Sequence, residues 1–267
     1  MILPQMNPQL VIASMAVAFT LGYASLLDLR ERRVPFRTWY PMLAIAVPMA
    51  AWTYLALLIS DTQLALGIIG AAAIFCGLFY FLAAYVHLFG GADAWAMIFI
   101  TACIPLFPIE PLFGYPPLFF FPLVVFLNAV LLNIATPLGI FVMNIIRGNR
   151  APLHYMFVGF PVDGNGIEDT FGFIMEEFDE QDGKLTRQFI TFRGALRRMI
   201  AGERRMYTRD LKRNPEQYTQ ELAHYRNAGK VWISYGVPFI VPITAGFLTA
   251  VFFGDLIYAA MTAIYGV

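Results

Sequence analysis

Two aspartates, Asp28 and Asp93, are the residues of this sequence best suited to chemistry, because each stands at the end of a long apolar run. Two carboxylates within hydrogen-bonding range cannot both ionise cheaply, so such a pair shares one proton and keeps one acid and one base near neutral pH. The ionised member can take a proton from water while the protonated member polarises a carbonyl group, which is the chemistry that peptide hydrolysis needs. Titration of the pair is coupled, so base and acid are not assigned individually.

Both aspartates also have readings that involve no catalysis. Asp28 can be an interfacial charge paired with Arg30 or Arg32, and Asp93 can cap the fourth apolar helix at its positive end. The two acids can instead form a proton or cation relay in a membrane transporter. A scaffold whose soluble part binds partners would need neither acid. The spacing of the two residues does not separate these readings.

The elements that must position these acids are expected to be membrane helices. The chain has 267 residues, of which 59% are hydrophobic and 13% charged, and its mean hydropathy is +0.63. A helix that crosses the hydrocarbon core needs about 20 mainly apolar residues. The sequence therefore predicts an all-α polytopic membrane protein with six transmembrane helices, at about 8–27, 40–60, 64–88, 94–108, 119–146 and 231–253.

The basic residues suggest how these helices are oriented. All 18 Lys and Arg residues lie in two stretches, 30–37 and 147–230. Under the positive-inside rule both stretches are cytoplasmic, and with six crossings both termini are then external. The loop that contains Asp93 falls on the cytoplasmic side, so both aspartates are expected at one face of the membrane.

The polar stretch 148–230 is long enough to form a small α+β cytoplasmic domain before the last helix. Alternating runs at 171–179 and 184–192 flank Gln181-Asp182-Gly183 and predict a β-hairpin. A third strand is expected within 155–162. Residues 193–225 read as helix with an interruption near Asn214-Pro215. The expected organisation is membrane domain 1–147, cytoplasmic domain 148–230 and membrane segment 231–267.

The residues around the two acids resemble the motifs of a known protein family. The segment 28–35, Asp-Leu-Arg-Glu-Arg-Arg-Val-Pro, resembles the motif that follows the first helix in type IV prepilin peptidases and archaeal preflagellin peptidases. Residues 90–93, Gly-Gly-Ala-Asp, are similar to the second motif of these enzymes, usually written GxGD, with Ala92 in place of its second glycine. The cytoplasmic insertion before the last helix also looks like the preflagellin-processing branch.

The resemblance implies a membrane aspartyl endopeptidase with Asp28 and Asp93 as its catalytic residues. Its substrates would be preflagellin- or prepilin-like precursors, whose leader peptides it would cleave at the cytoplasmic membrane face. Gly90 and Gly91 suit substrate binding, since glycine permits a sharp turn and close approach of an extended backbone. The expected partners are these precursors and membrane lipids, with no metal, organic cofactor or nucleic acid.

Other polar residues are weaker candidates. The arginines of 30–37 are expected to anchor the topology and to meet anionic lipid. The acidic residues of 163–182 could attract basic leader peptides or simply form a solvated face. Three asparagines in 119–146 could form hydrogen bonds between helices: Asn128, Asn133 and Asn144.

Overall fold

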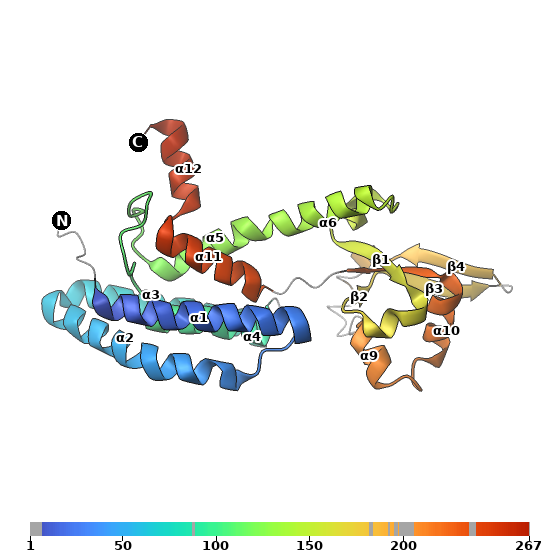
Figure 1. Ribbon diagram of the computed structural model, residues 1–267, viewed down its shortest axis with the longest axis horizontal. Coiled ribbons are helices and arrows are strands. Elements are labelled where there is room, and N and C mark those ends of the chain that lie inside the picture. Colours follow the sequence, from blue (N-terminus) through green and yellow to red (C-terminus); the bar gives the residue numbers. More distant parts are fainter. Residues whose placement is uncertain are drawn as a thin grey trace. The chain divides into compact units, whose positions relative to one another are not determined.

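The computed structural model describes residues 7–86, 89–181, 184–191, 193–194, 197, 206–234 and 239–266. The chain divides into two compact units, and each is described by itself (Figure 1). Unit 1 consists of Met1–Ile134 and Pro238–Val267, so it contains both ends of the chain. Unit 2 is the intervening part, Ala135–Val237.

Unit 1 is helical, with local sequence signals at its helix ends. The Asn7 side chain caps the first helix by accepting from the Gln9 N–H at 3.1 Å, and Asp61 caps the third through the Leu64 N–H at 3.0 Å. Helix α1 packs against α2 and α11, α3 against α4, and α5 against α11 (Figure 1). The described helices are α1 (Pro8–Glu31), the 3-10 turn η1 (Phe36–Trp39), α2 (Tyr40–Ser60), α3 (Thr62–Ala84), α4 (Gly91–Cys103), α5 (Phe121–Asn133), α11 (Ile240–Phe252) and α12 (Leu256–Tyr265).

The number of helices able to cross a membrane is smaller than expected. By length and composition, four described spans qualify: Pro8–Glu31, Phe36–Ser60, Thr62–Ala84 and Phe121–Ile146. The pair α11 and α12, bent by 53°, makes five if it counts as one span. The six predicted transmembrane helices are therefore not confirmed, although a multi-pass membrane architecture is.

The expected fourth span, 94–108, is the one that falls short. Helix α4 has 13 residues, which at about 1.5 Å per residue reach only two thirds of the way across a hydrocarbon core. The helix ends at Cys103 because Ile104 adopts φ −135° and ψ 75°. Pro105 follows, and proline disfavours helical geometry in the residue before it. A hydropathy pattern alone does not show this stop.

The last membrane helix is broken, and Asn128 satisfies the break. Gly254, between α11 and α12, has φ +95°, a conformation that favours glycine. The side chain of Asn128 in α5 donates to the Gly254 carbonyl at 2.8 Å and accepts from the Leu256 N–H at 3.1 Å. Asn128 is fully buried, so its amide replaces the backbone partners that the break removes. The expected hydrogen bonding of Asn128 between helices is confirmed.

Unit 2 combines an apolar helix with a small α+β fold. Its three-stranded antiparallel sheet has the order β1-β5-β2, and β3 and β4 form a separate two-stranded sheet. Its described elements are α6 (Ala135–Ile146), α7 (Leu153–Met156), β1 (Gly159–Asp163), the 3-10 helix η2 (Gly164–Asp169), β2 (Phe173–Ile174), β3 (Glu176–Gln181), β4 (Lys184–Phe189), α9 (Thr208–Arg213), α10 (Thr219–Ala228) and β5 (Lys230–Ser234).

Most local predictions for this unit hold. The hairpin is confirmed, with Gln181 paired to Lys184, and residues 182–183 between them lie outside the described residues. The third strand is confirmed as β1, although it starts at Gly159 and pairs with β5 instead of the hairpin. Much of the first part of the helical stretch predicted at 193–225 lies outside the described residues, and Met206 and Tyr207 are not helical. The interruption lies where expected, because α9 ends at Arg213 and α10 begins at Thr219.

The last membrane span was expected at 231–253, and its predicted first residue is wrong. Residues 230–234 form strand β5, which lies between β1 and β2, and α11 begins only at Ile240. Val231, Trp232 and Ile233 are all buried, since a central strand can be covered on both faces. Such a strand has the same apolar composition as the end of a membrane helix, which explains the error.

Asn144 has a different role from Asn128. Its side chain is fully buried and donates to the carbonyls of Met156 and Gly159, at 2.9 and 2.7 Å. Both bonds lie within unit 2, and they fasten α6 to the segment that leads into β1. Asn144 therefore connects a helix to a loop and a strand, whereas the sequence favoured a contact between helices.

Candidate active site

Asp28 lies in the last turn of α1, where the chain reverses direction. The backbone N–H of Arg32 donates to the Asp28 carbonyl at 3.0 Å and ends the helix. Arg32 has φ 54° and ψ 29°, a left-handed conformation that costs an L-residue about 1 kcal/mol. Arg32 lies close enough to the Asp28 carboxylate to attract it.

Asp93 is the third residue of α4 and reaches back to the turn before it. Its Oδ2 accepts a hydrogen bond from the Gly90 backbone N–H at 3.2 Å, which forms the cap that the sequence also allowed. A carboxylate has two oxygens and about four acceptor positions, so this bond leaves the group able to meet other partners. Capping and chemistry are thus compatible at Asp93.

The two glycines of the motif differ in their surroundings. A β-carbon added at Gly90 would lie 2.8 Å from Asp93 Oδ2, whereas one added at Gly91 would meet nothing within 4 Å. Gly90 thus permits the close approach of the aspartate, and Gly91 borders open space. Both glycines are exposed.

The structure brings Asp28 and Asp93 together. Helices α1 and α4 are in contact, and Asp28 lies near enough to Asp93 for its charge to act on that carboxylate. The charge pattern had predicted only one membrane face for the two acids. A third element joins them: the backbone N–H of Ile240, the first residue of α11, also bonds to the Asp93 carboxylate. The N-terminal ends of two helices, α4 and α11, therefore meet at one acid, and helix N-termini favour negative charge.

The role of α11 was missed from the sequence. Besides Ile240, Thr244 places its hydroxyl 2.8 Å from that of Ser25, which lies on α1 one turn before Asp28. Ser25 stands on the same helical face as Asp28, and this i, i+3 spacing is readable in the sequence. Thr244 lies 219 positions from Ser25, and no sequence pattern connects them.

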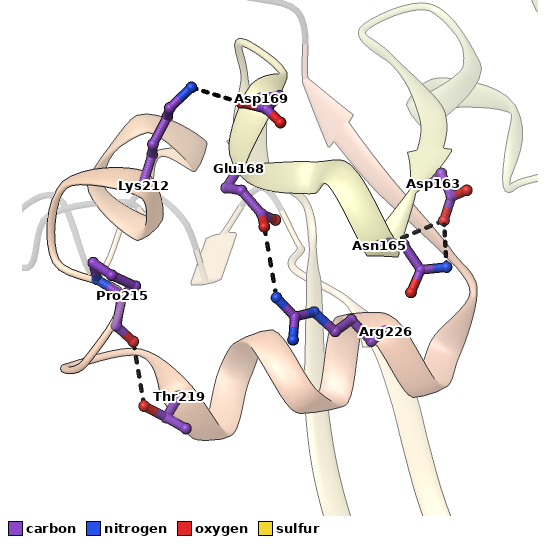
Figure 2. A network of polar contacts seen from close by, with 8 residues as sticks. All are labelled: Asp163, Asn165, Glu168, Asp169, Lys212, Pro215, Thr219 and Arg226. Carbon is purple, nitrogen blue, oxygen red and sulfur yellow. Dashed lines mark hydrogen bonds and ion pairs between the residues drawn. The ribbon is translucent and has the colours of Figure 1, made fainter.

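Several described acids of the acidic stretch have polar partners within unit 2. Figure 2 shows Glu168 facing Arg226 at 3.6 Å and Asp169 facing Lys212 at 2.6 Å. Asp163 accepts from the backbone and side chain of the neighbouring Asn165, at 2.9 and 3.2 Å (Figure 2). These contacts favour a solvated, internally paired face over a site that collects basic leader peptides.

Among the described residues, no three or more His, Cys, Asp or Glu side chains form a group that could hold a metal ion.

Comparison with known families gives the class of protein. Several apolar helices define a multi-pass membrane protein. Residues 15–144 match the type IV leader peptidase family, and residues 151–256 match the archaeal peptidase A24 C-terminus, type II. No curated protein matches the sequence significantly.

The chain therefore belongs to the type IV leader peptidase family, that of the prepilin and preflagellin peptidases. The first match contains both Asp28 and Asp93, and the second includes Ile240 and Thr244. Both families are peptidases, which gives no support to the transporter alternative. The expected resemblance is confirmed at the level of the family.

Proposed function

We propose that this leader peptidase is of the aspartic type, with Asp28 and Asp93 as its catalytic pair, and that it cleaves the leader peptides of preflagellin- or prepilin-like precursors. The observation that carries the proposal is the proximity of two carboxylates from the contacting helices α1 and α4, where the charge of Asp28 acts on Asp93. A merely capping Asp93 has no need of a second acid beside it.

The mechanism follows from a shared proton. The ionised aspartate takes a proton from water as the water attacks the scissile carbonyl, and the protonated aspartate polarises that carbonyl and then protonates the departing amine. The open space beside Gly91 suits the extended backbone of the precursor. The close contact of Gly90 with Asp93 sets the orientation of the carboxylate.

We place the site at the cytoplasmic face, with both chain termini outside. The basic stretches 30–37 and 147–230 lie on the same side only if the chain crosses the membrane an even number of times between them. Three spans qualify there by length: Phe36–Ser60, Thr62–Ala84 and Phe121–Ile146. The short helix α4 and the irregular residues 104–120 must then complete a fourth crossing. Irregular backbone is tolerated at that depth where protein covers it, and Ile104 and Phe107 are buried.

The test is cleavage of recombinant preflagellin and prepilin precursors by the full chain in detergent or in lipid nanodiscs. Asp28→Asn and Asp93→Asn should each lower kcat/KM by at least about 10³-fold, as loss of an essential acid or base does. Asparagine keeps an oxygen that can accept the Gly90 N–H, so Asp93→Asn preserves the cap and removes only the ionisable group.

Asp61→Asn is the matched control, because Asp61 also caps a helix but lies at the start of α3. Wild-type cleavage by this variant is expected. Full activity of either Asp28→Asn or Asp93→Asn would exclude the catalytic pair.

A further inference from the structure

The first turn of α11 connects the two helices that carry the aspartates. At one end, the Ile240 N–H bonds to the Asp93 carboxylate. The Ile240 carbonyl accepts from the Thr244 hydroxyl at 2.9 Å, and that hydroxyl lies 2.8 Å from the hydroxyl of Ser25 on α1. A continuous series of hydrogen bonds thus leads from Asp93 to the turn of α1 just before Asp28.

The protons of this series can be assigned without conflict. Each hydroxyl has one proton to donate and two acceptor positions. If Ser25 donates to Thr244, the Thr244 proton goes to the carbonyl of Ile240 at 2.9 Å or of Leu21 at 3.3 Å. Every described member then has a partner, which matters because Ser25 is only 8% exposed.

The surroundings of the hydroxyl pair are apolar. The buried side chains of Leu21, Ala24, Ile240 and Ile243 belong to the hydrophobic core of unit 1. Ser25 is buried and Thr244 is half-buried, so water replaces a lost hydrogen bond there only in part, and polar contacts in such a place hold helices in one register. The hydroxyl pair is thus a specific contact in an otherwise non-directional interface.

A second contact holds the same turn of α11 against the glycine motif. Phe89, directly before Gly90, packs against Phe239, directly before Ile240, with ring centroids 5.5 Å apart and an interplanar angle of 37°. The start of α11 is therefore held to the Asp93 side by an aromatic contact and a backbone hydrogen bond, and to the Asp28 side by two hydroxyl groups.

From these contacts we infer that Ser25 and Thr244 are positioning residues: their hydroxyl contact holds α1 against the first turn of α11 and so sets the approach of Asp28 to Asp93. This inference rests on the proposed catalytic pair. It adds that α11, which contains neither aspartate, fixes the position of one catalytic aspartate relative to the other.

The test uses the full chain and the same precursor cleavage assay. Thr244→Val and Ser25→Ala should lower kcat by about 10- to 100-fold with KM near the wild-type value, since misplacement of a catalytic group by about 1 Å has effects of this size. Thr244→Ser keeps the hydroxyl and should restore most of kcat. The double variant should lose no more than the poorer single variant, because the two groups act as one contact.

Thr53→Val is the matched control. The Thr53 hydroxyl is buried and donates to the Met49 carbonyl of its own helix at 3.0 Å. Its loss should leave kcat unchanged. If Thr244→Val and Ser25→Ala retain the wild-type kcat while Asp28→Asn is inactive, the positioning role is wrong and the catalytic pair stands.

A cross-link tests the contact without reference to catalysis. Ser25→Cys and Thr244→Cys, combined in a chain with Cys76→Ala and Cys103→Ala, should form a disulfide on mild oxidation, since side-chain oxygens 2.8 Å apart place the two positions within its reach. Mass spectrometry of the linked peptides gives the yield. Absence of the disulfide would overturn the inference, whether or not the proposed function holds. A disulfide-linked enzyme that loses its activity would also overturn it.

Discussion

The acids of the two units have opposite surroundings. In unit 2, Glu168 faces Arg226 and Asp169 faces Lys212, so charge is neutralised at short range. In unit 1, Asp93 faces a second acid, Asp28, together with backbone N–H groups. Unit 2 holds most of the acids of the chain, and yet the pair suited to catalysis lies in unit 1. The comparison teaches that an acid is marked for chemistry by what it faces, and that local charge density is a poor guide.

Burial alone is a poor guide as well, as Glu176 shows. Its side chain is completely buried in unit 2, where one carboxylate oxygen accepts from the Trp232 N–H at 2.8 Å. The Met175 N–H donates to the carbonyl of the same Trp232 at 3.0 Å, directly after the end of β2. The Glu176 side chain thus accepts the Trp232 N–H in place of the backbone carbonyl that a longer β2 would offer. Arg187 lies 3.7 Å from the other oxygen. This buried acid completes a sheet and faces no second acid.

The largest expected effect tests how closely unit 1 is packed. A β-carbon at Gly246 in α11 would lie 2.5 Å from the Ala129 nitrogen and 2.6 Å from the Val125 oxygen of α5. Gly246→Ala must separate two helix backbones and should destabilise the protein by about 3 kcal/mol, measured by thermal or denaturant unfolding in detergent. Gly70→Ala in α3 is the control, because its β-carbon meets nothing within 4 Å. Equal stability of the two variants would contradict this picture of the interface.

The next effect concerns the acid pair itself. Gly90→Ala places a β-carbon against Asp93 Oδ2 and should turn the carboxylate away from Asp28, lowering kcat about tenfold. The control is Gly67→Ala in α3, where an added β-carbon meets nothing within 4 Å, and it should cleave precursors at nearly the wild-type rate. Each variant adds one methyl group. Should they cleave equally well, the orientation of Asp93 does not limit the reaction.

A smaller effect tests the structural role of Glu176. Burial raises the pKa of its carboxyl group, opposed in part by the Trp232 N–H and by Arg187. The folded state therefore holds the proton to higher pH than the unfolded state does. Stability is highest at low pH and falls as the pH rises through the folded pKa, by at most about 1.4 kcal/mol per pH unit.

Hydrogen exchange of the Trp232 amide, corrected for the intrinsic rate, measures this slope between about pH 5 and pH 8. Glu176→Gln should flatten it, because glutamine does not titrate. The exposed neighbour supplies the control, and Glu177→Gln should keep the wild-type slope. A slope that survives in Glu176→Gln would assign the pH dependence to another group.

The smallest effect is expected at the paired surface of unit 2. The side chains of Lys212 and Asp169 are 62% and 68% exposed, so their ion pair contributes less than about 1 kcal/mol. Asp169→Asn should leave both stability and the KM for a precursor unchanged. An increase in KM would show instead that this face collects basic leader peptides and would weaken the contrast between the units.

The sequence reached the acid pair because two independent signals agree there. Charge topology predicted one membrane face for Asp28 and Asp93, and the flanking residues matched two family motifs. The hairpin was also predictable, since period-two alternation and a turn signal occur together around 181–183. Such local patterns predict structure correctly where the contacts are between residues close together in the sequence.

The errors arose where composition is ambiguous or contacts are distant. Strand β5 is apolar on both faces and reads as the start of a membrane helix. Helix α4 ends at Cys103 although apolar residues continue beyond it. The contacts of Ile240 and Thr244 with the site depend on tertiary packing, so no window of sequence contains them.

The position of α11 has a consequence for biosynthesis. Ser25 and Thr244 are 219 residues apart, and at about 5–20 residues per second a ribosome needs roughly 10 to 40 s to travel from one codon to the other. For most of that interval, once Asp93 has been made, the nascent chain carries both aspartates but not the helix that joins them. The site is thus completed only after unit 2 has been translated, and a chain that terminates prematurely within unit 2 lacks the helix that joins the two aspartates.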